Sequence, residues 1–480
     1  MVVGDFMLDQ HVYGAAERLS PDAPVPVLHA TKSEDRPGGA SNVSLCIRGL
    51  KGEVVCFGVV GADDAGRTLR AKLVEAGCDV GGIIDDPARP TTIKRSLIGL
   101  AQHRHPQKMF RMDIETREPL PAHIEEALLD LIAARIDSVD VVCLEDYNKG
   151  VCTPRVCRRL VDLCRKHDKE LLVDPAAIED YSKYRSATAV TPNRSEAELA
   201  TGLDTPIDAS ELHNAGLATK LLSELDLDAV VLTLDKHGAL LEERGGKPQV
   251  VPTIARDVYD VTGAGDIVLA ALAGARANGL AWLDAVRFAN IAAGLEVQVF
   301  GAQPIPFANV QREALAQTRT FANKVRDLDD LLVELAVHRE AGHRIVFTNG
   351  NFDVIHAGHI GYLREARTLG GEDGVLVVAI NADEQVRAQK GQGRPIYSAA
   401  DRADILSEMQ CVDFVTIFEE PTVDDPLRRI QPDLYVKGGD YKPSEINEYE
   451  TAKKLGIELR VLSHRPGLSS RHVIERMRKS

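Results

Sequence analysis

Four short apolar runs between residues 139 and 234 constrain the fold more than any other feature of this sequence. The runs 139–144, 170–173, 187–191 and 229–234 have the length and nearly continuous apolar character of strands that are buried on both faces. Polar segments with helical periodicity separate them, a pattern typical of a parallel sheet covered by helices. The sequence therefore predicts α/β architecture, with ligands at the carboxyl ends of the strands.

A glycine-rich stretch, DVTGAGD at 260–266, comes directly before an apolar run. If a helix starts here, the backbone N–H groups of Gly263, Ala264 and Gly265 have no partner within the helix and form an anion cradle. The Asp266 carboxylate would then lie beside a bound phosphate, as a base next to an anion hole, which suggests phosphoryl transfer to a hydroxyl. An ordinary glycine turn, with Asp266 complementing the helix dipole, explains the stretch alone equally well.

Two segments near the N-terminus could contact a sugar. Asp9 ends a predicted strand over 2–9, and an ionised carboxylate can accept hydrogen bonds from two hydroxyl groups at once. Gly38 and Gly39 allow close approach of a ligand, and the Asn42 amide could hydrogen-bond its hydroxyls. Taken singly, a turn aspartate and a plain loop-to-helix turn are the simpler interpretations.

Polar residues follow the predicted strands where ligands are expected. The third run is followed by Asn193, Arg194, Ser195 and Glu196, and the fourth by Asp235 and Lys236. Asn193 and Glu196 could form a helix cap or could hold the hydrated magnesium of a nucleotide. Because no GxxxxGK[ST] loop occurs in the sequence, any phosphate chemistry must use another cradle.

In their order and separation, four motifs resemble the ribokinase-like sugar kinase family: GGASN at 38–42, DP at 174–175, NRSE at 193–196 and DVTGAGD at 260–266. The resemblance implies a three-layer α/β/α domain with a small β lid. It makes Asp266 the base that deprotonates the acceptor hydroxyl and the three residues before it the anion hole. The implied ATP-binding residues are Asn193, Arg194, Ser195, Glu196, Asp235 and Lys236, with Glu196 acting on Mg²⁺ indirectly. The implied sugar-binding residues are Asp9, Gly38, Gly39 and Asn42.

A second, smaller α/β unit begins at Arg344. A predicted strand over 345–350 leads into NFDVIHAGH at 351–359. Two histidines near a helix N-terminus, His356 and His359, could stabilise charge that grows on the α-phosphate of a nucleotide during attack. A zinc site would need further ligands, and no carboxylate or cysteine follows at helical spacing. A structural histidine pair is the other alternative.

This HxGH stretch resembles the cytidylyltransferase type of nucleotidyltransferase, whose members attack the α-phosphate of a nucleoside triphosphate and release pyrophosphate. The resemblance implies a Rossmann-like domain. The candidate nucleotide-binding residues are Asn349, Gly350, Phe352, Asp353, Lys390, Arg394, Lys437, Ser469 and Ser470. A solvated charge run is the alternative for the two cations at 390–394, and helix capping is the alternative for the serines.

The length of 480 residues predicts two or three domains. The strand and helix rhythm stops near residue 302, and 327–340 reads as an amphipathic helix. We therefore expect a kinase domain at 1–315, a helical linker at 316–343 and a transferase domain at 344–480.

A net charge of -15 argues against nucleic acid or an anionic membrane as the main partner. No apolar run approaches the ~20 residues of a membrane span, and the N-terminus lacks the features of a signal peptide. We expect a cytoplasmic protein. Its eight cysteines include no CxxC pair, so reduced thiols are expected.

The fusion of these two domains closely resembles the family of bifunctional heptose kinases and adenylyltransferases. The resemblance implies phosphorylation of D-glycero-β-D-manno-heptose 7-phosphate at C1. A separate phosphatase must then remove the 7-phosphate, after which transfer of AMP from ATP to heptose 1-phosphate gives ADP-heptose for the lipopolysaccharide core. It also implies a homo-oligomer, expected to be a dimer. Candidates for holding the 7-phosphate are Lys94, Arg104, Lys108 and Arg111. The alternatives are another sugar kinase fused to a different cytidylyl- or adenylyltransferase, and a non-catalytic sugar-phosphate sensor.

Overall fold

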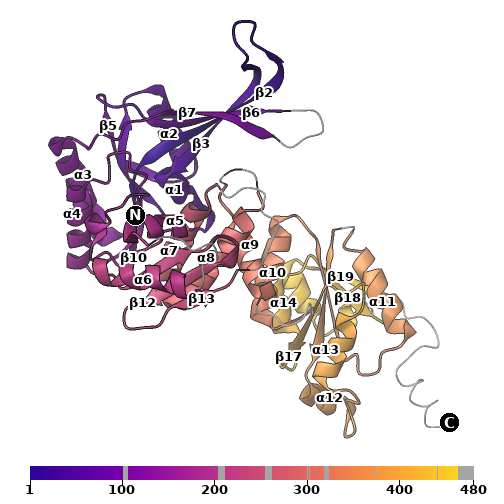
Figure 1. The fold of residues 1–480 in the computed structure, drawn as a ribbon. Coiled ribbons are helices and arrows are strands. Elements are labelled where there is room, and N and C mark those ends of the chain that lie inside the picture. The colour runs from indigo at the N-terminus through magenta and orange to yellow at the C-terminus, as the bar shows by residue number, and fades with distance from the viewer. Residues whose placement is uncertain are drawn as a thin grey trace. The chain divides into compact units, whose positions relative to one another are not determined.

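The computed structural model describes residues 1–100, 106–203, 211–253, 262–299, 301, 303–317, 324–371, 373–439 and 442–462. The chain divides into two compact units, Met1–Val310 and Gln311–Ser480 (Figure 1). Each unit is built around its own largely parallel sheet. The α/β architecture that the sequence predicts is confirmed in both.

The central sheet of the first unit has the strand order β13-β12-β11-β10-β9-β8-β1-β4-β5. Its strands are β1 (Val2–Gly4), β4 (Val55–Gly61), β5 (Asp79–Asp86), β8 (Val141–Glu145), β9 (Glu170–Asp174), β10 (Ala189–Val190), β11 (Ala229–Thr233), β12 (Ala239–Glu243) and β13 (Gln249–Val251). The strands from β5 to β11 pair in parallel, and β12 and β13 are antiparallel. Because β1 pairs with β4 on one side and β8 on the other, the strand order reverses there, where ligands of such sheets bind.

Helices cover both faces of this sheet, which makes the three layers that were expected. One apolar core lies under α1 (Ala40–Gly49), α2 (Asp64–Glu75), α7 (Ala264–Ala277) and α8 (Trp282–Glu296). The other lies under α3 (Ala122–Arg135), α4 (Pro154–Lys166), α5 (Arg194–Thr201) and α6 (Glu211–Leu225). Along β1 the side chains alternate between the cores, with Val2 in the first and Val3 in the second.

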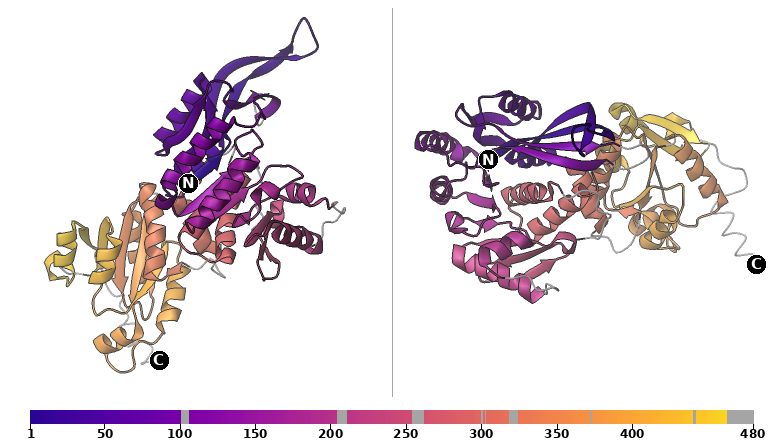
Figure 2. Two further views of the ribbon diagram at one scale, coloured as in Figure 1. Left: turned by 90° about the vertical axis from the view of Figure 1, so that its left-hand side faces the viewer. Right: turned by 45° about the horizontal axis from the view of Figure 1, so that its top comes forward.

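A separate sheet with the order β3-β2-β6-β7 forms a lid that projects from the first unit (Figure 1 and Figure 2). Its strands are β2 (Phe6–Leu19), β3 (Pro26–Gly39), β6 (Thr92–Gly99) and β7 (Gln107–Ile114). The single strand predicted over 2–9 is therefore wrong: Asp5 separates β1 from β2, so the chain passes from the central sheet into the lid at this residue. Asp9 consequently lies within a lid strand and not at the end of a central one.

The second unit contains a parallel sheet with the order β14-β17-β16-β15-β18-β19. Its strands are β14 (Val325–Arg326), β15 (Ile345–Gly350), β16 (Val375–Asn381), β17 (Phe414–Phe418), β18 (Leu434–Gly438) and β19 (Glu458–Leu462). Its helices include α10 (Leu328–Glu340), α11 (Ala357–Thr368), α12 (Asp383–Lys390), α13 (Ala399–Ser407), α14 (Asp424–Ile430) and α15 (Tyr449–Leu455). The order reverses at β15, which pairs with both β16 and β18.

Part of the predicted helical linker belongs to the fold of the second unit. Leu331 and Leu335 of α10 are fully buried in its core, and β14 pairs with β17. Strand β14 was not predicted, because a strand of two residues is too short to show a hydrophobic periodicity. The bounds 1–315 and 344–480 stay predictions, and α9 (Phe307–Gln317) crosses the point at which the two units divide.

Within the described residues, no helix combines the length and apolar character needed to cross a membrane. All eight cysteines are free, and all but Cys411 are buried.

Candidate active sites

The helix start predicted after DVTGAGD is present. Helix α7 begins at Ala264, and its N-cap Gly263 has a φ of 95°, a left-handed conformation that glycine adopts readily. The first helical hydrogen bond runs from Ile267 N–H to the Gly263 carbonyl at 3.0 Å. The N–H groups before it, including those of Ala264 and Gly265, belong to the helix end that attracts anions.

Asp266 is buried in the first turn of α7 and held from two sides. Asn42 Nδ2 donates to Oδ2 at 2.6 Å, and the Tyr147 hydroxyl donates to Oδ1 at 3.2 Å. Burial raises the pKa of Asp266 to about 6, although both hydrogen bonds act in the opposite direction. A carboxylate with this pKa is mostly ionised at neutral pH and still basic enough to take a proton.

A cavity of about 470 Å³ opens beside Asp266. The lid supplies Asp9, Lys94, Lys108 and Arg111 to its lining, and the central domain supplies Tyr147, Gly263 and Asp266. Gly39 lines it as well. The structure therefore brings two of the predicted sugar-binding residues, Asp9 and Gly39, to the same cavity as the predicted base Asp266.

The sugar-facing candidates include two unsatisfied acceptors. Within the part of the chain that the structure describes, no donor contacts the buried oxygens Asp9 Oδ1 and Asn42 Oδ1. A Cβ on Gly38 would lie 2.7 Å from the Asp9 carboxylate, so a larger residue at this position would displace that carboxylate. Buried acceptors without donors suit a ligand that carries hydroxyl groups.

The cations of the lid face the same cavity. Lys94 is the register partner of Asp9 on β6, and its Nζ lies 4.2 Å from the centre of the Tyr147 ring. Lys108 Nζ donates to Thr262 Oγ1 at 3.3 Å. Arg111 also lines the cavity, whereas Arg104 lies outside the described residues.

Asn193 and Glu196 form a capping box at the start of α5. Glu196 N–H donates to Asn193 Oδ1 at 3.0 Å, and Asn193 N–H donates to Glu196 Oε2 at 2.8 Å. The cap interpretation is thus confirmed, while a magnesium contact of Glu196 stays a prediction, as do nucleotide contacts of Arg194 and Ser195. Asp235 begins a short 3-10 turn and is exposed. The side chain of Lys236 lies outside the described part of the structure.

Three carboxylates meet near the ends of β8, β9 and the start of α7. Glu145, Asp174 and Asp266 each place an oxygen within 4.8 Å of the others. Burial and the neighbouring carboxylates raise the pKa of Glu145 and of Asp174 well above their usual values. The sequence reasoning located Glu145 and Asp174 at strand ends but did not predict that they meet, because β8 and β9 had no assigned register.

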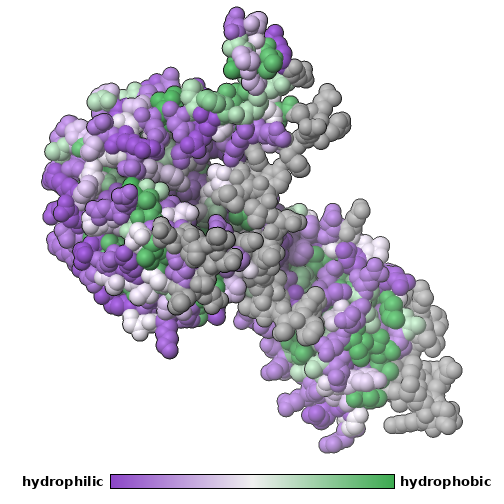
Figure 3. Space-filling model, in the orientation of Figure 1, coloured by the Kyte–Doolittle hydropathy of each residue, from purple (hydrophilic) through white to green (hydrophobic). Residues whose placement is uncertain are grey.

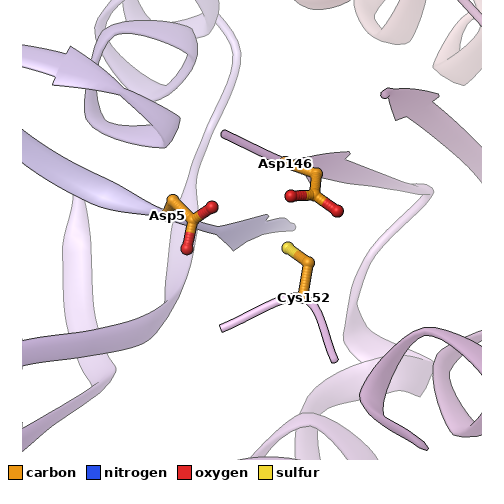
Figure 4. Close-up of side chains that lie close together, drawn as sticks. All are labelled: Asp5, Asp146 and Cys152. Atoms are coloured by element: carbon orange, nitrogen blue, oxygen red, sulfur yellow. The ribbon is translucent and has the colours of Figure 1, made fainter. Parts of the chain in front are cut away.

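A second acidic group, Asp5, Asp146 and Cys152, lies nearby with its side chains pointing toward one another (Figure 4). Its charge is already compensated, because Asp146 accepts a hydrogen bond from Lys183 Nζ and Asp5 accepts one from the Tyr147 N–H at 2.8 Å. This group positions the loop after β8, and with it the Tyr147 hydroxyl that the sequence reasoning missed.

In the second unit, the two histidines come together at the start of α11, beyond the carboxyl end of β15. His356 is the N-cap, and its Nδ1 accepts a hydrogen bond from Gly358 N–H at 3.2 Å. The His356 and His359 rings stack with centroids 3.9 Å apart, and Phe352 lies 5.3 Å from His359. The predicted pairing at a helix N-terminus is present.

Asp353 has a different environment from the one that the sequence suggested. It is buried, pairs with Arg394 and accepts a hydrogen bond from Ile396 N–H at 2.6 Å. A buried carboxylate engaged in this way holds the 394–397 segment in place. A direct nucleotide contact of Asp353 stays a prediction.

Arg402 is a structural residue of this site that the sequence did not predict. Its guanidinium is fully buried and donates to the carbonyl oxygens of Asn351 at 2.6 Å, Asn381 at 2.9 Å and Tyr397 at 3.1 Å, and to the Asp383 carboxylate at 2.7 Å. It ties together the segments after β15, β16 and α12. Nothing in the sequence separates this arginine from a surface arginine on a helix.

The remaining candidates of the second unit lie around the same edge of the sheet. Tyr435 hydroxyl donates to Asn349 Oδ1 at 2.7 Å, and Lys437 Nζ lies 3.9 Å from the Glu448 carboxylate. Gly350 ends β15, and the exposed Lys390 ends α12. Ser469 and Ser470 lie outside the described residues.

Comparison with known families divides the chain in the same way. Residues 1–308 match the pfkB family of carbohydrate kinases, and residues 347–476 match the cytidylyltransferase-like family.

Solved structures share the fold of the first unit. A ribokinase from Arabidopsis thaliana, solved with ribose and ATP, has 20% identity and a TM-score of 0.51, and the match covers 65% of this chain and 97% of that one. Phosphofructokinase-2 from Escherichia coli has 17% identity and a TM-score of 0.54, with 66% and 99% covered. The ribokinase-like fold is thereby confirmed.

Full-length relatives resemble both units at once. The bifunctional protein HldE of Geotalea uraniireducens is 39% identical over 478 residues, covering 100% of this chain and 95% of the relative. The bifunctional protein HldE of Geobacter sulfurreducens is 38% identical over 480 residues, covering 100% and 96%. The chain therefore belongs to the family of the bifunctional protein HldE, with a pfkB-type carbohydrate kinase followed by a cytidylyltransferase-like domain.

Proposed function

We propose that the two units catalyse two separate steps in the synthesis of ADP-heptose. The chain is a bifunctional heptose kinase and adenylyltransferase, and ATP is a substrate of both reactions. The first unit phosphorylates D-glycero-β-D-manno-heptose 7-phosphate at C1, and the second converts heptose 1-phosphate and ATP to ADP-heptose and pyrophosphate. The observation that carries the kinase assignment is Asp266, a buried carboxylate of raised pKa in the first turn of α7, beside a cavity that is also lined by the unsatisfied acceptor Asp9.

In the kinase step, Asp266 accepts the proton of the C1 hydroxyl as its oxygen attacks the γ-phosphorus of ATP, and ADP leaves. The N–H groups of Gly263, Ala264 and Gly265 donate to the phosphoryl oxygens as charge develops on them. The cavity supports this arrangement because Asp266 lines it next to Gly263.

The sugar would be held by the lid strand β2 and by helix α1. Asp9 and Asn42 offer the unsatisfied acceptors to its hydroxyl groups. The cations Lys94, Lys108 and Arg111 line the same cavity and would bind the 7-phosphate. A substrate that carries both a phosphate and hydroxyl groups matches this combination of cations and acceptors.

ATP and Mg²⁺ would lie along the start of α5, with Glu196 acting on the ion through water. Bound Mg²⁺ neutralises charge on the phosphates during transfer. The Glu196 side chain fits an indirect role, because one of its oxygens already accepts the Asn193 N–H of the capping box.

In the second unit, a phosphate oxygen of heptose 1-phosphate attacks the α-phosphorus of ATP, and pyrophosphate leaves. His356 and His359, stacked at the N-terminus of α11, stabilise the charge on the α-phosphate. Proposed nucleotide contacts are Asn349, Gly350, Phe352, Asp353, Lys390, Arg394, Lys437, Ser469 and Ser470.

The lid also supports association into a homodimer. Edge strand β7 exposes Met109, Phe110, Met112 and Ile114, with 64% of Phe110 accessible, and apolar side chains are visible on the lid sheet in Figure 3. We place the protein in the cytoplasm, where its substrates would be.

Phosphorus NMR tests both reactions. Incubation with ATP and heptose 7-phosphate should give a bisphosphate with a new C1 resonance, and incubation with ATP and heptose 1-phosphate should give ADP-heptose and pyrophosphate. No bisphosphate from the intact chain would refute the kinase assignment. Turnover of heptose lacking the 7-phosphate at an equal rate would refute the role of the lid cations.

A further inference from the structure

We propose that Glu448 is a positioning residue of the second unit, which keeps the ammonium group of Lys437 charged and directed toward a substrate phosphate. Which phosphate Lys437 meets depends on the adenylyl transfer, so this role rests on the proposed function, whereas the pairing of the two side chains does not. Three features support the role: the place of Lys437 in the sheet, the burial of both side chains and the helix cap that Glu448 does not form.

Lys437 lies at the edge of the sheet where a nucleotide would bind. It is the next-to-last residue of β18, which pairs in parallel with β15. Strand β15 leads to His356 and His359 at the start of α11, so the lysine and the two histidines follow the same edge of the sheet. Ligands of open parallel sheets bind at this edge, beside the strand where the order reverses.

The ammonium group of Lys437 keeps its hydrogen-bond donors available. Among the described residues, the Glu448 carboxylate lies at ion-pair distance from Nζ, at 3.9 Å, and the lysine side chain is 23% exposed. This distance is too long for a hydrogen bond. A mostly buried ammonium that does not donate to its counter-ion can donate to a phosphate oxygen instead.

Glu448 is placed where capping a helix would be its simpler function. It is the N-cap residue of α15, and an acidic side chain there can accept hydrogen bonds from the first helical turn. The Glu448 side chain makes no such cap hydrogen bond. It is instead 9% exposed and lies beside Lys437. Because a buried carboxylate is costly without a cation, the pairing accounts for this position and capping does not.

Tyr435 connects the pair to the end of β15. Its hydroxyl donates to Asn349 Oδ1 at 2.7 Å, and burial together with the charge of Glu448 raises the pKa of Tyr435. Tyr435 and Lys437 are two residues apart on β18, so their side chains point to the same face of the sheet. The centre of the Tyr435 ring lies 5.8 Å from Lys437 Nζ. The ring and the Glu448 carboxylate thus restrict the directions in which the Lys437 side chain can lie.

Burial and pairing have opposite effects on the charge of Lys437. Burial lowers the pKa of Lys437 below its usual value, and Glu448 acts in the opposite direction. Strand β19 offers the uncharged Val461 as the register partner of Lys437. The other ionisable side chains that act on these residues lie on β18, α14 and α11, and they are Tyr435, Asp424 and Tyr362. Removal of the Glu448 charge should therefore let Lys437 lose its proton at a lower pH.

The pH dependence of adenylyl transfer tests this role on the full chain. We compare kcat/KM for ATP, with heptose 1-phosphate, between about pH 7 and pH 10 in the wild type, in Glu448→Gln and in Glu450→Gln, an exposed control in the first turn of α15. An opposite charge at this distance shifts a pKa by about one unit or more, so the alkaline limb of Glu448→Gln should move down by about one pH unit. The rate should be about tenfold lower on that limb and nearly unchanged at neutral pH, while Glu450→Gln should follow the wild type.

Two further variants separate the charge of Glu448 from a purely structural role. Glu448→Asp keeps the charge and should retain most of the activity on the alkaline limb. Lys437→Arg carries a guanidinium that stays protonated over this pH range, so adding Glu448→Gln to it should not shift the limb. Thermal unfolding at each pH shows whether the variants are folded. If Glu448→Gln does not fold, Glu448→Ala, which buries no polar group, takes its place.

Carbon-13 labelling of the lysine Cε atoms gives a second measurement that needs no turnover. The resonance that is missing from Lys437→Arg belongs to Lys437, and its titration midpoint should fall by about one pH unit when the Glu448 charge is removed. An unchanged midpoint, or an equal loss of activity at every pH, would overturn the role of Glu448. A lowered midpoint in a chain that makes no ADP-heptose would support the pairing and refute the proposed adenylyl transfer.

Discussion

The hydroxyl of Tyr147 should set the pH at which the kinase becomes active. It donates to Asp266 Oδ1 at 3.2 Å and thereby stabilises the ionised carboxylate. Tyr147→Phe removes this donor and keeps the ring under Lys94, whose Nζ lies 4.2 Å from the ring centre. The substitution therefore isolates a single hydrogen bond to the base.

The size of the effect follows from the length of that bond. A hydrogen bond to a charged group contributes about 1.5–3 kcal/mol, and the long Tyr147 bond belongs at the lower end. Since about 1.4 kcal/mol corresponds to one pKa unit, the pKa of Asp266 should rise by about one unit. A base must be ionised to act, and its pKa in the wild type is about 6. The acidic limb of the rate profile should therefore move upward by about one pH unit.

The assay is kcat/KM for heptose 7-phosphate between pH 5 and pH 9, measured by ADP release. At pH 6 about half of Asp266 is ionised in the wild type but only roughly a tenth in the variant, so the variant should be about fivefold slower. Near pH 8 the two enzymes should have nearly the same kcat/KM. Adenylyl transfer by the same preparation is the internal control. Superimposable profiles, or an equal loss at every pH, would refute the link between Tyr147 and the ionisation of Asp266.

Four further substitutions test the two units separately. Asp266→Asn should lower the kinase rate by about 10²- to 10⁴-fold and leave adenylyl transfer intact, and His359→Ala should do the reverse; loss of both activities from either change would contradict independent sites. Gly38→Ala should raise the KM for heptose 7-phosphate about tenfold, since its Cβ would lie 2.7 Å from the Asp9 carboxylate; an unchanged KM would remove Asp9 from sugar binding. Arg402→Leu should destabilise the second unit by about 3–5 kcal/mol in urea unfolding, because several buried acceptors lose their donor; a change below 1 kcal/mol would show that water replaces it.

Much of the fold of the first unit could be predicted from the sequence, because its central strands are buried on both faces. Continuous apolar runs such as 141–144 and 229–232 are visible in a sequence without knowledge of their partners. The lid offers no such signal. Every residue of β7 is exposed, and β3 carries charges and glycines, so neither has the alternation of a half-buried strand. These strands form because they pair with neighbouring strands of the lid sheet, and their own residue pattern does not predict them.

The sites show the same division. Gly263 and Asp266 stand next to each other in the chain, so a helix start alone could place them correctly. Tyr147 and Asn42 reach Asp266 from residues more than a hundred positions away, and only the fold brings them together. The hydrogen bonds of Asp353 to the 394–397 segment could not be predicted, because a carboxylate that contacts a ligand and one that holds a loop look alike in sequence.

Arg402 affects how the second active site tolerates mutation. Three of its acceptors, at Asn351, Asn381 and Tyr397, are main-chain carbonyl groups, which every amino acid possesses. Substitutions at those positions can alter what the loops present to a ligand while the path of the backbone stays anchored. A mutational scan of these loops should therefore find many positions that tolerate substitution and one arginine that does not. New substrate preferences can then arise in these loops while the fold of the unit is kept.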